Sequence, residues 1–378
     1  MPGDPQPALI IFSGGRPASP IEDMVLRAQR AIARDTIERA LSARAFGRVI
    51  LVTDSLELAG SVTGDVEIEL DTGPFHFGRR LKEIIDRYGL ERPFYAGAGS
   101  MALLDAEQLA ALAYTLANAE RKVIANNLYS ADWVAFTPGS AIHEIELPSA
   151  DNPLALRLRD QAGLRDACPP RTPATQFDVD TPADLLVLKV HPGVGVQARR
   201  YVESLPLDDS RLRAALRFFK DPQAEVLIAG RVGSHLWSYL ETETACRVRL
   251  FSEERGMRSD GREERGEVRS LLGFHLEMVG PYKFFRTLAE LGDAAFLDTR
   301  VLFHHLHLAL SAADRFLSDL GRVDEISHPF LREFTQAAVE APIPVVLGGH
   351  SLVSGGLWAI VDAAWKAETN CALPERVL

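Results

Sequence analysis

The sequence predicts a two-domain α/β protein, and three of its features lead to that prediction. Its 378 residues exceed the usual length of one domain, and an apolar fraction of 47% can fill two hydrophobic cores. Strand-like and helix-like segments alternate in both halves, as a parallel sheet covered by helices requires. The alternation stops around residues 190–222, where His191-Pro192-Gly193 breaks regular structure. We therefore expect one domain in residues 1–200 and a second, smaller α/β domain in residues 201–378.

In the first half, two continuous apolar runs predict strands that are buried on both faces of a sheet. They occupy residues 8–12 and 49–54. Helices are expected over residues 24–43, where apolar side chains recur on one side, and over residues 78–88. Ligands of open α/β sheets bind beyond the carboxyl ends of the strands. Asp54 is therefore expected either to face a ligand or to cap the next helix.

The segment of residues 177–185 combines an acidic pair with the start of a helix. Thr181 is placed to cap that helix, and Pro182 fits its first position, where a missing N–H costs nothing. Asp178 and Asp180 stand at the junction between an extended segment and the helix. Carboxylate oxygens held there suit Mg²⁺. A well-capped helix start with no metal is the alternative interpretation.

Two more motifs precede this segment in a fixed order. An apolar strand runs into Ser13-Gly14-Gly15-Arg16, and Gly97-Ala98-Gly99-Ser100-Met101-Ala102-Leu103-Leu104 precedes a helix-like segment. With residues 177–185, this set resembles the nucleotidyltransferase domain shared by molybdenum-cofactor guanylyltransferase, the CMP-sugar synthetases and phospholactate guanylyltransferase. Chains of that superfamily open with a strand and a Gly-Gly loop, carry a Gly-Asp-x-Pro-Leu-Leu turn, and often close with Asp-Thr-Pro-x-Asp-Leu. The resemblance covers residues 8–190.

The resemblance implies a Rossmann-like, GT-A-like nucleotidyltransferase domain. Its reaction would transfer a nucleotidyl group from a nucleoside triphosphate to a small phosphorylated or acidic acceptor, with Mg²⁺ as the cofactor. The implied nucleotide site contains Gly14, Gly15, Arg16 and Ser100, with Arg16 offsetting phosphate charge. Asp178 and Asp180 would hold the metal, and Arg16 and Asp180 would be the catalytic residues.

The sequence departs from the family pattern at two places, which keeps an alternative open. Ser100 stands where the family has its central magnesium-binding aspartate, and a serine hydroxyl is a weak neutral ligand. The opening loop lacks the usual lysine, since the first lysine of the chain is Lys82. The alternative is a catalytically silent nucleotide-binding or scaffold protein that has kept the fold.

A polar turn follows the strand-like residues 123–125. Asn126, Asn127 and Asp132 lie in it, and asparagine amides can read a base edge or a sugar hydroxyl because they donate and accept. The family carries acceptor contacts in this region, so the resemblance makes these residues candidates for acceptor binding. An Asx-turn beside a buried aromatic residue is the alternative.

The second half repeats the alternation of strands and helices and resembles no family that we recognise. Strands are expected within residues 225–234 (strand and Gly-rich turn), 247–252, 294–300 and 344–351, so the domain would be Rossmann-like. Their following loops would meet at one edge and bring together Arg231, Ser234, Glu253, Arg255, Asp298, Arg300, His350 and Ser351. This set predicts a site for a small anionic ligand, with His350 as an acid or base. A network of ion pairs satisfied among themselves is the alternative, and a third hypothesis places the chain's chemistry in this domain.

Two segments look functional at first sight, one rich in histidine and one rich in charged residues, but each has a simpler structural interpretation. In Phe303-His304-His305-Leu306-His307 only His304 and His307 would share a helix face, so we expect no metal site there. Residues 253–269 mix charges of both signs, which predicts a mobile surface loop or, alternatively, a lid over an acidic or phosphorylated ligand.

Composition narrows the function classes. A net charge of −11 argues against binding to nucleic acid, and no apolar run is long enough to span a membrane. The N-terminus lacks the basic start of a signal peptide, and Cys168, Cys246 and Cys371 are too far apart in sequence for a disulfide framework or a zinc site. We expect a cytoplasmic protein whose partners are a nucleoside triphosphate and a small anionic acceptor, and a homo-oligomer is compatible with the sequence.

Overall fold

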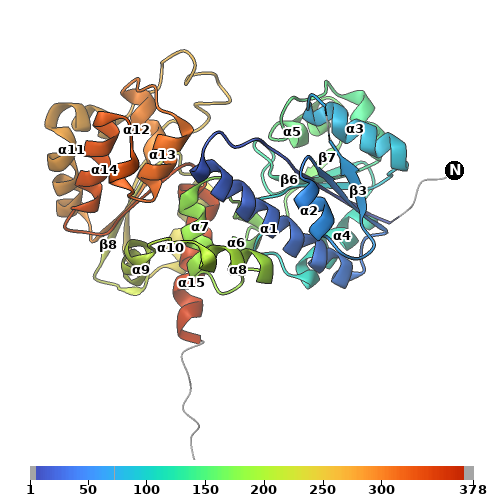
Figure 1. Cartoon of the computed structure of the whole chain (residues 1–378), viewed down its shortest axis with the longest axis horizontal. Helices are drawn as coiled ribbons and strands as arrows, with labels where there is room; N and C mark the ends of the chain where they lie inside the picture. Colours follow the sequence, from blue (N-terminus) through green and yellow to red (C-terminus); the bar gives the residue numbers. More distant parts are fainter. Residues whose placement is uncertain (1–5, 72, 370–378) are drawn as a thin grey trace, which may run out of the picture. The chain divides into compact units, whose positions relative to one another are not determined.

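The computed structural model describes residues 6–71 and 73–369 (Figure 1). Contacts between residues divide the chain into two compact units. The first unit holds Leu26–Asp178, Gly195–Ala198 and the chain up to Arg16. The second holds Pro17–Val25, Val179–Val194 and the chain from Arg199 onward. A unit defined by contacts is not yet a domain that folds on its own, so the predicted domain division at residue 200 stays a prediction.

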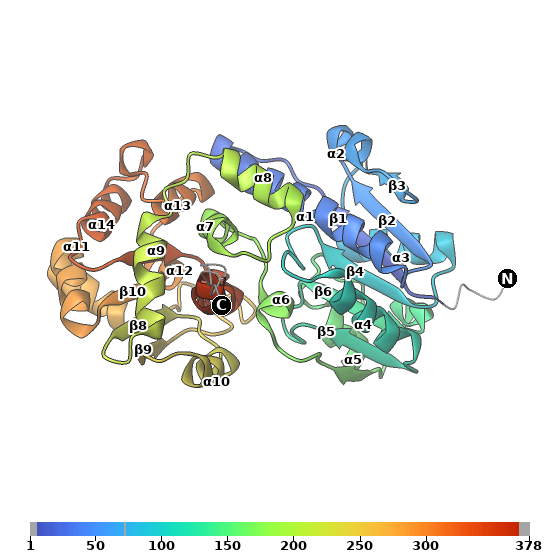
Figure 2. The same ribbon diagram turned by 90° about the horizontal axis from the view of Figure 1, so that it is seen from below.

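The first unit contains a seven-stranded sheet with the order β3-β2-β1-β4-β6-β5-β7 (Figure 2). The strands are β1 (Ala8–Ser13), β2 (Arg48–Thr53), β3 (Glu67–Leu70), β4 (Pro93–Gly97), β5 (Lys122–Ala125), β6 (Trp133–Thr137) and β7 (Arg165–Ala167). The predicted strands β1 and β2 are confirmed, and all six residues of β1 are buried. β6 runs antiparallel to β4 and β5, whereas the other pairs are parallel. The sheet is therefore mixed, where the alternation of segments had predicted a parallel one.

The helical segments of the first half, with one 3₁₀ segment η1, are α1 (Pro20–Ala43), α2 (Leu56–Ser61), α3 (Phe77–Tyr88), α4 (Ala106–Ala117), η1 (Gly139–Glu144), α5 (Leu154–Asp160) and α6 (Pro173–Gln176). One face of the sheet packs against α3 and α5, where Ile10, Leu81 and Leu154 share a core. Burial of such apolar side chains is the main stabilising contribution to the unit.

The order of the strands places a switch point between β1 and β4. β2 and β3 follow β1 on one side of it, and the chain then returns to add β4 on the other side. Loops at such a reversal leave a crevice at the carboxyl ends of the strands. The loops that begin at Gly14 and at Ala98 flank this position.

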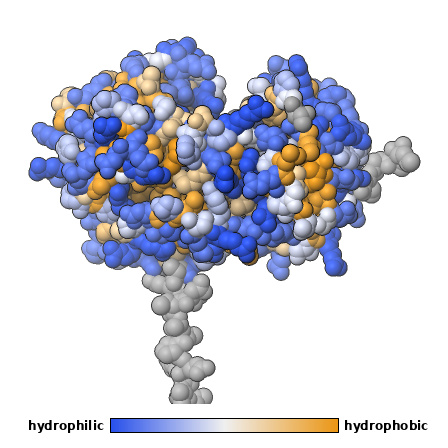
Figure 3. Space-filling model, viewed as in Figure 1, coloured by the Kyte–Doolittle hydropathy of each residue, from blue (hydrophilic) through white to orange (hydrophobic). Residues whose placement is uncertain are grey.

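The edge strand β3 has an unusual distribution of polarity. Glu69 is 9% exposed, whereas its neighbours Ile68 and Leu70 are 37% and 45% exposed. The Glu69 carboxylate is accommodated because it accepts hydrogen bonds from the Arg80 guanidinium at 3.0 Å and the Tyr88 hydroxyl at 2.7 Å. Figure 3 shows apolar surface on the face of the first unit that carries α2 and β3. β3 was not predicted, because its apolar side chains do not mark its buried face.

The second unit contains a four-stranded parallel sheet in the order β11-β10-β8-β9. Its strands are β8 (Glu225–Gly230), β9 (Arg247–Ser252), β10 (Ala294–Asp298) and β11 (Val345–Gly348). All four predicted strands are confirmed. Their carboxyl ends lie at one edge, since the strands are parallel. The description of this unit as a Rossmann-like domain stays a prediction.

The helices of the second half are α7 (Pro182–Val190), α8 (Val196–Ser204), α9 (Ser210–Leu216), α10 (Ser234–Glu243), α11 (Leu271–Leu291), α12 (Thr299–His305), α13 (Ala312–Asp319), α14 (Pro329–Val339) and α15 (Leu357–Thr369). α11 contains a break at Gly280, whose φ is +74° and which precedes Pro281. Beyond the break, Phe284 and Phe285 enter a core with Phe334 of α14. α11, α13 and α14 were not predicted from the sequence.

Candidate functional site

The loop after β1 carries the predicted phosphate-binding residues of the first unit. Gly14, Gly15 and Arg16 are exposed, and Arg16 makes no hydrogen bond or ion pair with any described residue. The Gly15 backbone N–H donates to Asp54 Oδ2 at 3.2 Å. Ser55 caps α2, so Asp54 does not take the capping role. A carboxylate therefore lies at an amide that was predicted to hold a phosphate.

The turn after β4 connects the three sequence motifs. The Ala98 backbone N–H donates to the Phe12 carbonyl at the end of β1, at 3.0 Å. Ser100 forms an isolated antiparallel β-bridge with Asp178 of the closing motif. The Ser100 side chain is 2% exposed, and its hydroxyl donates to the Gly97 carbonyl at 2.8 Å. The opening, middle and closing motifs thus meet at the carboxyl end of β4.

Three carboxylates surround the hydroxyl of Tyr95, which lies in β4. This hydroxyl donates to Asp151 Oδ2 at 2.9 Å. Burial, together with the charges of Asp151, Asp178 and Asp132, raises the pKa of Tyr95 well above its usual value. Burial also raises the pKa of Asp151. Asp151 was missed at the sequence level, because it stands in a loop before α5 and no local motif marks it.

The predicted acceptor-binding residues are partly used in local structure. Asn126 is 4% exposed, donates from Nδ2 to Asp132 Oδ2 at 2.6 Å, and accepts from the Asp132 backbone N–H at 3.1 Å. Asn127 Oδ1 accepts from the Tyr129 backbone N–H at 3.1 Å, as in an Asx-turn. Tyr129 is 70% exposed, and the Arg159 guanidinium lies 6.0 Å from its ring centre.

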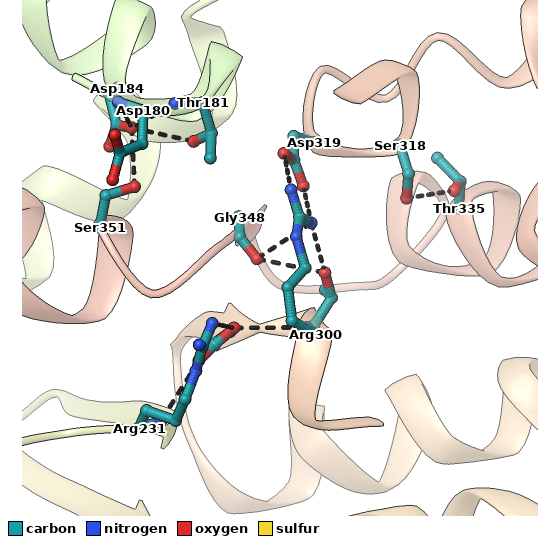
Figure 4. Close-up of polar contacts among 12 residues, drawn as sticks. Asp180, Thr181, Asp184, Arg231, Arg300, Ser318, Asp319, Thr335, Gly348 and Ser351 are labelled. Carbon is teal, nitrogen blue, oxygen red and sulfur yellow. Dashed lines mark hydrogen bonds and ion pairs between the residues drawn. The ribbon is translucent and has the colours of Figure 1, made fainter. Parts of the chain in front are cut away.

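The closing motif starts α7 as predicted, with Thr181 as the N-cap and Pro182 as the first helical residue. Asp184 is 0% exposed, and its Oδ2 accepts hydrogen bonds from the Thr181 backbone N–H at 2.8 Å and the Ser351 hydroxyl at 2.7 Å (Figure 4). Asp184 Oδ1 is buried without a hydrogen-bond partner. Burial, reinforced by the charge of Asp180, raises the pKa of Asp184 to about 7.

The residues predicted to bind magnesium belong to different units. Asp178 ends a segment of the first unit, and Asp180 is an exposed residue of the second. Within residues 6–71 and 73–369, no three His, Cys, Asp or Glu side chains form a group that could hold a metal ion. Mg²⁺ in phosphate-transferring sites is usually held by one or two carboxylates and the substrate phosphates. Asp178 is compatible with that mode, and the metal stays a prediction.

The carboxyl edge of the second sheet carries the eight residues predicted there, and several of them are engaged in ion pairs or helix caps. Arg231 pairs with Asp298 through Nε–Oδ2 and Nη2–Oδ1 contacts of 2.6 and 3.0 Å (Figure 4). The Arg300 guanidinium donates two hydrogen bonds to the Asp319 carboxylate, from Nη1 to Oδ1 at 2.7 Å and from Nη2 to Oδ2 at 2.6 Å. Glu253 accepts from the Leu271 backbone N–H at the start of α11. For these residues the structure supports the interpretation as an internally satisfied network. Ser234, Arg255 and His350 remain exposed.

The charged segment of residues 253–269 is anchored at several points. Met257 and Val268 are almost fully buried and share a small cluster with Val301 of α12. Glu254 accepts two hydrogen bonds from the Arg262 guanidinium, each of 2.9 Å. Glu263 Oε1 lies 3.1 Å from His304 Nε2, and α12 ends before His307. The segment is therefore a loop packed onto α12.

Among known proteins, the chain is similar to several solved structures. No family model matches the chain, and none of the curated proteins matches it. A cytidylyltransferase from Leptospira borgpetersenii is 14% identical, with a TM-score of 0.39 over 52% of this chain and 91% of its own. A CMP:2-keto-3-deoxy-manno-octonic acid synthetase complexed with CTP is 12% identical, with a TM-score of 0.34 over 48% of this chain and 95% of its own. A 4-diphosphocytidyl-2C-methyl-D-erythritol synthase is 14% identical, with a TM-score of 0.35 over 49% of this chain and 97% of its own.

None of the helices in the described part of the chain has the length and the apolar character needed to cross a bilayer. At these identities and TM-scores, the similarity to solved structures carries no argument about the activity of this chain. Over about half of its length, the chain is similar to solved structures of cytidylyltransferases.

Proposed function

We propose that the chain is a nucleotidyltransferase-like protein that takes a nucleoside triphosphate, with Mg²⁺, at the carboxyl edge of the first unit's sheet. The acceptor would be a small phosphorylated or acidic molecule. The observation that carries this proposal is the meeting of three motifs at the switch point. The Ala98–Phe12 backbone bond joins the β4 turn to β1, and the Ser100–Asp178 bridge joins it to the closing motif.

The charges at this edge support a nucleotide accompanied by a cation. Asp54, Asp132, Asp151 and Asp178 would repel a bare triphosphate, since like charges in a partly buried site destabilise each other. When bound, Mg²⁺ would supply positive charge between the phosphates and Asp178. Gly14 and Gly15 would offer backbone amides, and Arg16 is unpaired and suited to a bidentate phosphate contact. Asp180 stays a further candidate for the metal.

The proposed chemistry is the attack of an acceptor oxygen on the α-phosphorus, with pyrophosphate as the leaving group. In such transfers positioning and electrostatic stabilisation supply most of the catalysis. Asn127 and Tyr129 are exposed beside the paired Asn126 and Asp132, so this turn offers amide and hydroxyl groups to an acceptor. The Ser100 hydroxyl would have to leave the Gly97 carbonyl before it could contact a ligand.

One observation favours the catalytically silent alternative. The central position holds a buried Ser100 whose hydroxyl is engaged with Gly97, and Asp54 already accepts from the Gly15 amide. A protein with these features would bind a nucleotide weakly and release no pyrophosphate.

Calorimetric titration of the full chain with ATP, CTP, GTP and UTP, with and without Mg²⁺, tests the proposal. We expect at least millimolar affinity for one of them in the presence of Mg²⁺. Asp178→Asn should weaken that affinity by about tenfold, the size of one charged contact. Asp65→Asn, on an exposed loop of the same unit, is the matched control and should change nothing.

The outcomes separate the alternatives. Binding to none of the four nucleotides would overturn the nucleotide site. If a nucleotide binds but no pyrophosphate is released when phosphorylated sugars and small acids are offered as acceptors, the catalytically silent alternative is supported.

A further inference from the structure

Helix α11 exposes large apolar side chains on the side that does not pack on the second unit. Its buried side contacts α12, α14 and β8, and the helix lies at the margin of this unit in both Figure 1 and Figure 2. Four apolar or aromatic side chains, between 46% and 76% exposed, lie on the other side: Leu271, Phe274, Met278 and Tyr282. We call these four residues the α11 stripe. Apolar side chains gathered in one exposed patch mark an interaction surface, whereas scattered ones do not.

Charged residues accompany the stripe, and their sign changes at the break in the helix. Glu277 lies before Gly280, and its side chain is half-exposed. Lys283 and Arg286 lie after Gly280, are exposed, and form no ion pair with any side chain that the structure describes. The exposed side of α11 is therefore acidic just before the break and basic just after it.

The two charge signs are arranged symmetrically about Gly280. When two antiparallel helices are related by a two-fold axis at this residue, each position before it faces the position equally far after it in the second copy. Glu277 then faces Lys283 of the second copy, so opposite charges meet, and the symmetry makes this contact twice. A Cβ built on Gly280 would meet no atom within 4 Å. The crossing point thus has no side chain, which lets two backbones approach closely.

The same symmetry matches members of the α11 stripe with suitable partners. Met278 faces Tyr282 of the second copy, and a thioether packs favourably against an aromatic ring. Phe274 faces Arg286 of the second copy, whose guanidinium can lie over the ring. Each of these contacts also occurs twice. The exposed side of α11 around Gly280 is therefore complementary to itself when it is turned round.

We propose that α11 forms a two-fold interface with α11 of a second copy of this chain, with the axis at Gly280. A contact of this symmetry uses one surface twice, so it requires a self-complementary face. A second copy fits better than a different protein, because both members of each pair lie on this one helix. The proposal uses no residue of the first unit's nucleotide site, so it is independent of the proposed function.

Sedimentation velocity of the full chain tests the interface. The 21 residues of α11 span about 30 Å, and one helix face is small for an interface, so we expect a dissociation constant of about 1–100 µM. Met278→Lys places a charge in the stripe and should raise that constant by at least about tenfold. The matched control is Leu56→Lys in the first unit, because Leu56 is 75% exposed and Met278 is 76% exposed.

An exchange of charges tests the pairing itself. Glu277→Lys alone and Lys283→Glu alone each place like charges opposite each other twice, so each should weaken dimerisation by about tenfold. An equimolar mixture of these two variants has opposite charges at both contacts and should regain dimers. The variant that carries both substitutions should dimerise as well as the unaltered chain. Because Glu277 Oε2 lies 3.6 Å from His305 Nε2, the melting temperature of each variant is measured alongside. Misfolding of one variant would not be repaired by mixing it with the other.

The outcomes that overturn the proposal are distinct. They are a chain that stays monomeric up to about 200 µM, a dimer that Met278→Lys leaves intact, and a mixture of charge variants that does not regain dimers. A dimer that is disrupted by Leu56→Lys but not by Met278→Lys would place the contact in the first unit. A monomer that sediments with phosphatidylserine vesicles, and no longer does so as Met278→Lys, would assign the α11 stripe to a membrane surface.

Discussion

The carboxyl edges of the two sheets differ in charge although both are built from loops that follow strands. At the first edge, Asp132, Asp151 and Asp178 surround Tyr95, and Asp54 reaches the Gly15 amide. At the second edge, Arg231 and Arg300 are each paired with a buried carboxylate, Asp298 and Asp319. The arrangement of strands places a site, and the charges of its loops decide what it binds. The acidic first edge suits the proposed ligand that arrives with a cation, whereas the second edge neutralises its own charges in ion pairs.

The largest expected effect tests whether ion pairs hold the second edge together. Asp298→Ala leaves the Arg231 guanidinium, whose side chain is 15% exposed, without its buried carboxylate. We expect a loss of about 3–5 kcal/mol in the free energy of unfolding, measured with urea. Glu325→Ala breaks the exposed pair with Arg322 and should cost less than about 1 kcal/mol. Similar losses in both variants would contradict the distinction between buried and exposed pairs.

An intermediate effect concerns the protonation of Asp184. Its pKa is about 7 in the folded protein and 3.8 for an unperturbed aspartate. Between these values the folded state binds more protons than the unfolded chain, so this group makes stability fall as the pH rises from about 4 to 7. The expected fall is about 1–4 kcal/mol, because one pKa unit corresponds to about 1.4 kcal/mol. In Asp184→Asn that part of the pH dependence should disappear, which urea unfolding at several pH values measures. An unchanged profile would show that Asp184 is ionised in the folded protein.

The smallest expected effect sharpens the contrast at the first edge. Asp54→Asn removes a negative charge beside Gly15 but keeps an oxygen that can accept from its amide. Affinity for a nucleoside triphosphate should rise by about twofold to fivefold, since an exposed charge pair contributes less than about 1 kcal/mol. Calorimetry of the variant beside Asp65→Asn measures the difference. A lower affinity would mean that Asp54 contacts the ligand or its metal.

Sequence patterns predicted those parts of the fold that local signals determine. The apolar run of β1 and the Thr181-Pro182 cap of α7 were both confirmed. β3 was missed because Glu69 is buried by partners from α3, which no local pattern reveals. The antiparallel direction of β6 is likewise set by its pairing with β4 and β5.

For the candidate sites, as for the fold, the sequence predicted some features and missed others. The meeting of the second unit's loops follows from a parallel sheet, so the residues at its edge could be named in advance. The partners of these residues could not be predicted, because they come from helices distant in sequence. Arg300 pairs with Asp319 of α13, and Ser351 donates to Asp184 of α7. Asp151 belongs to the first unit's candidate site through tertiary packing alone, and nothing in the sequence around it indicates that.

The return of residues 195–198 to the first unit affects how the chain can fold during its synthesis. The Asp35 carboxylate, 4% exposed, accepts from the backbone N–H groups of Gln197 and Ala198 at 2.9 Å each, across 162 and 163 residues. A ribosome adds about 5–20 residues per second, so these donors follow Asp35 by roughly 10–30 s. Until they emerge, the carboxylate must stay hydrated. The first unit therefore cannot finish folding before the ribosome has made half of the protein, and a fragment that ends before residue 195 would leave Asp35 without these two donors.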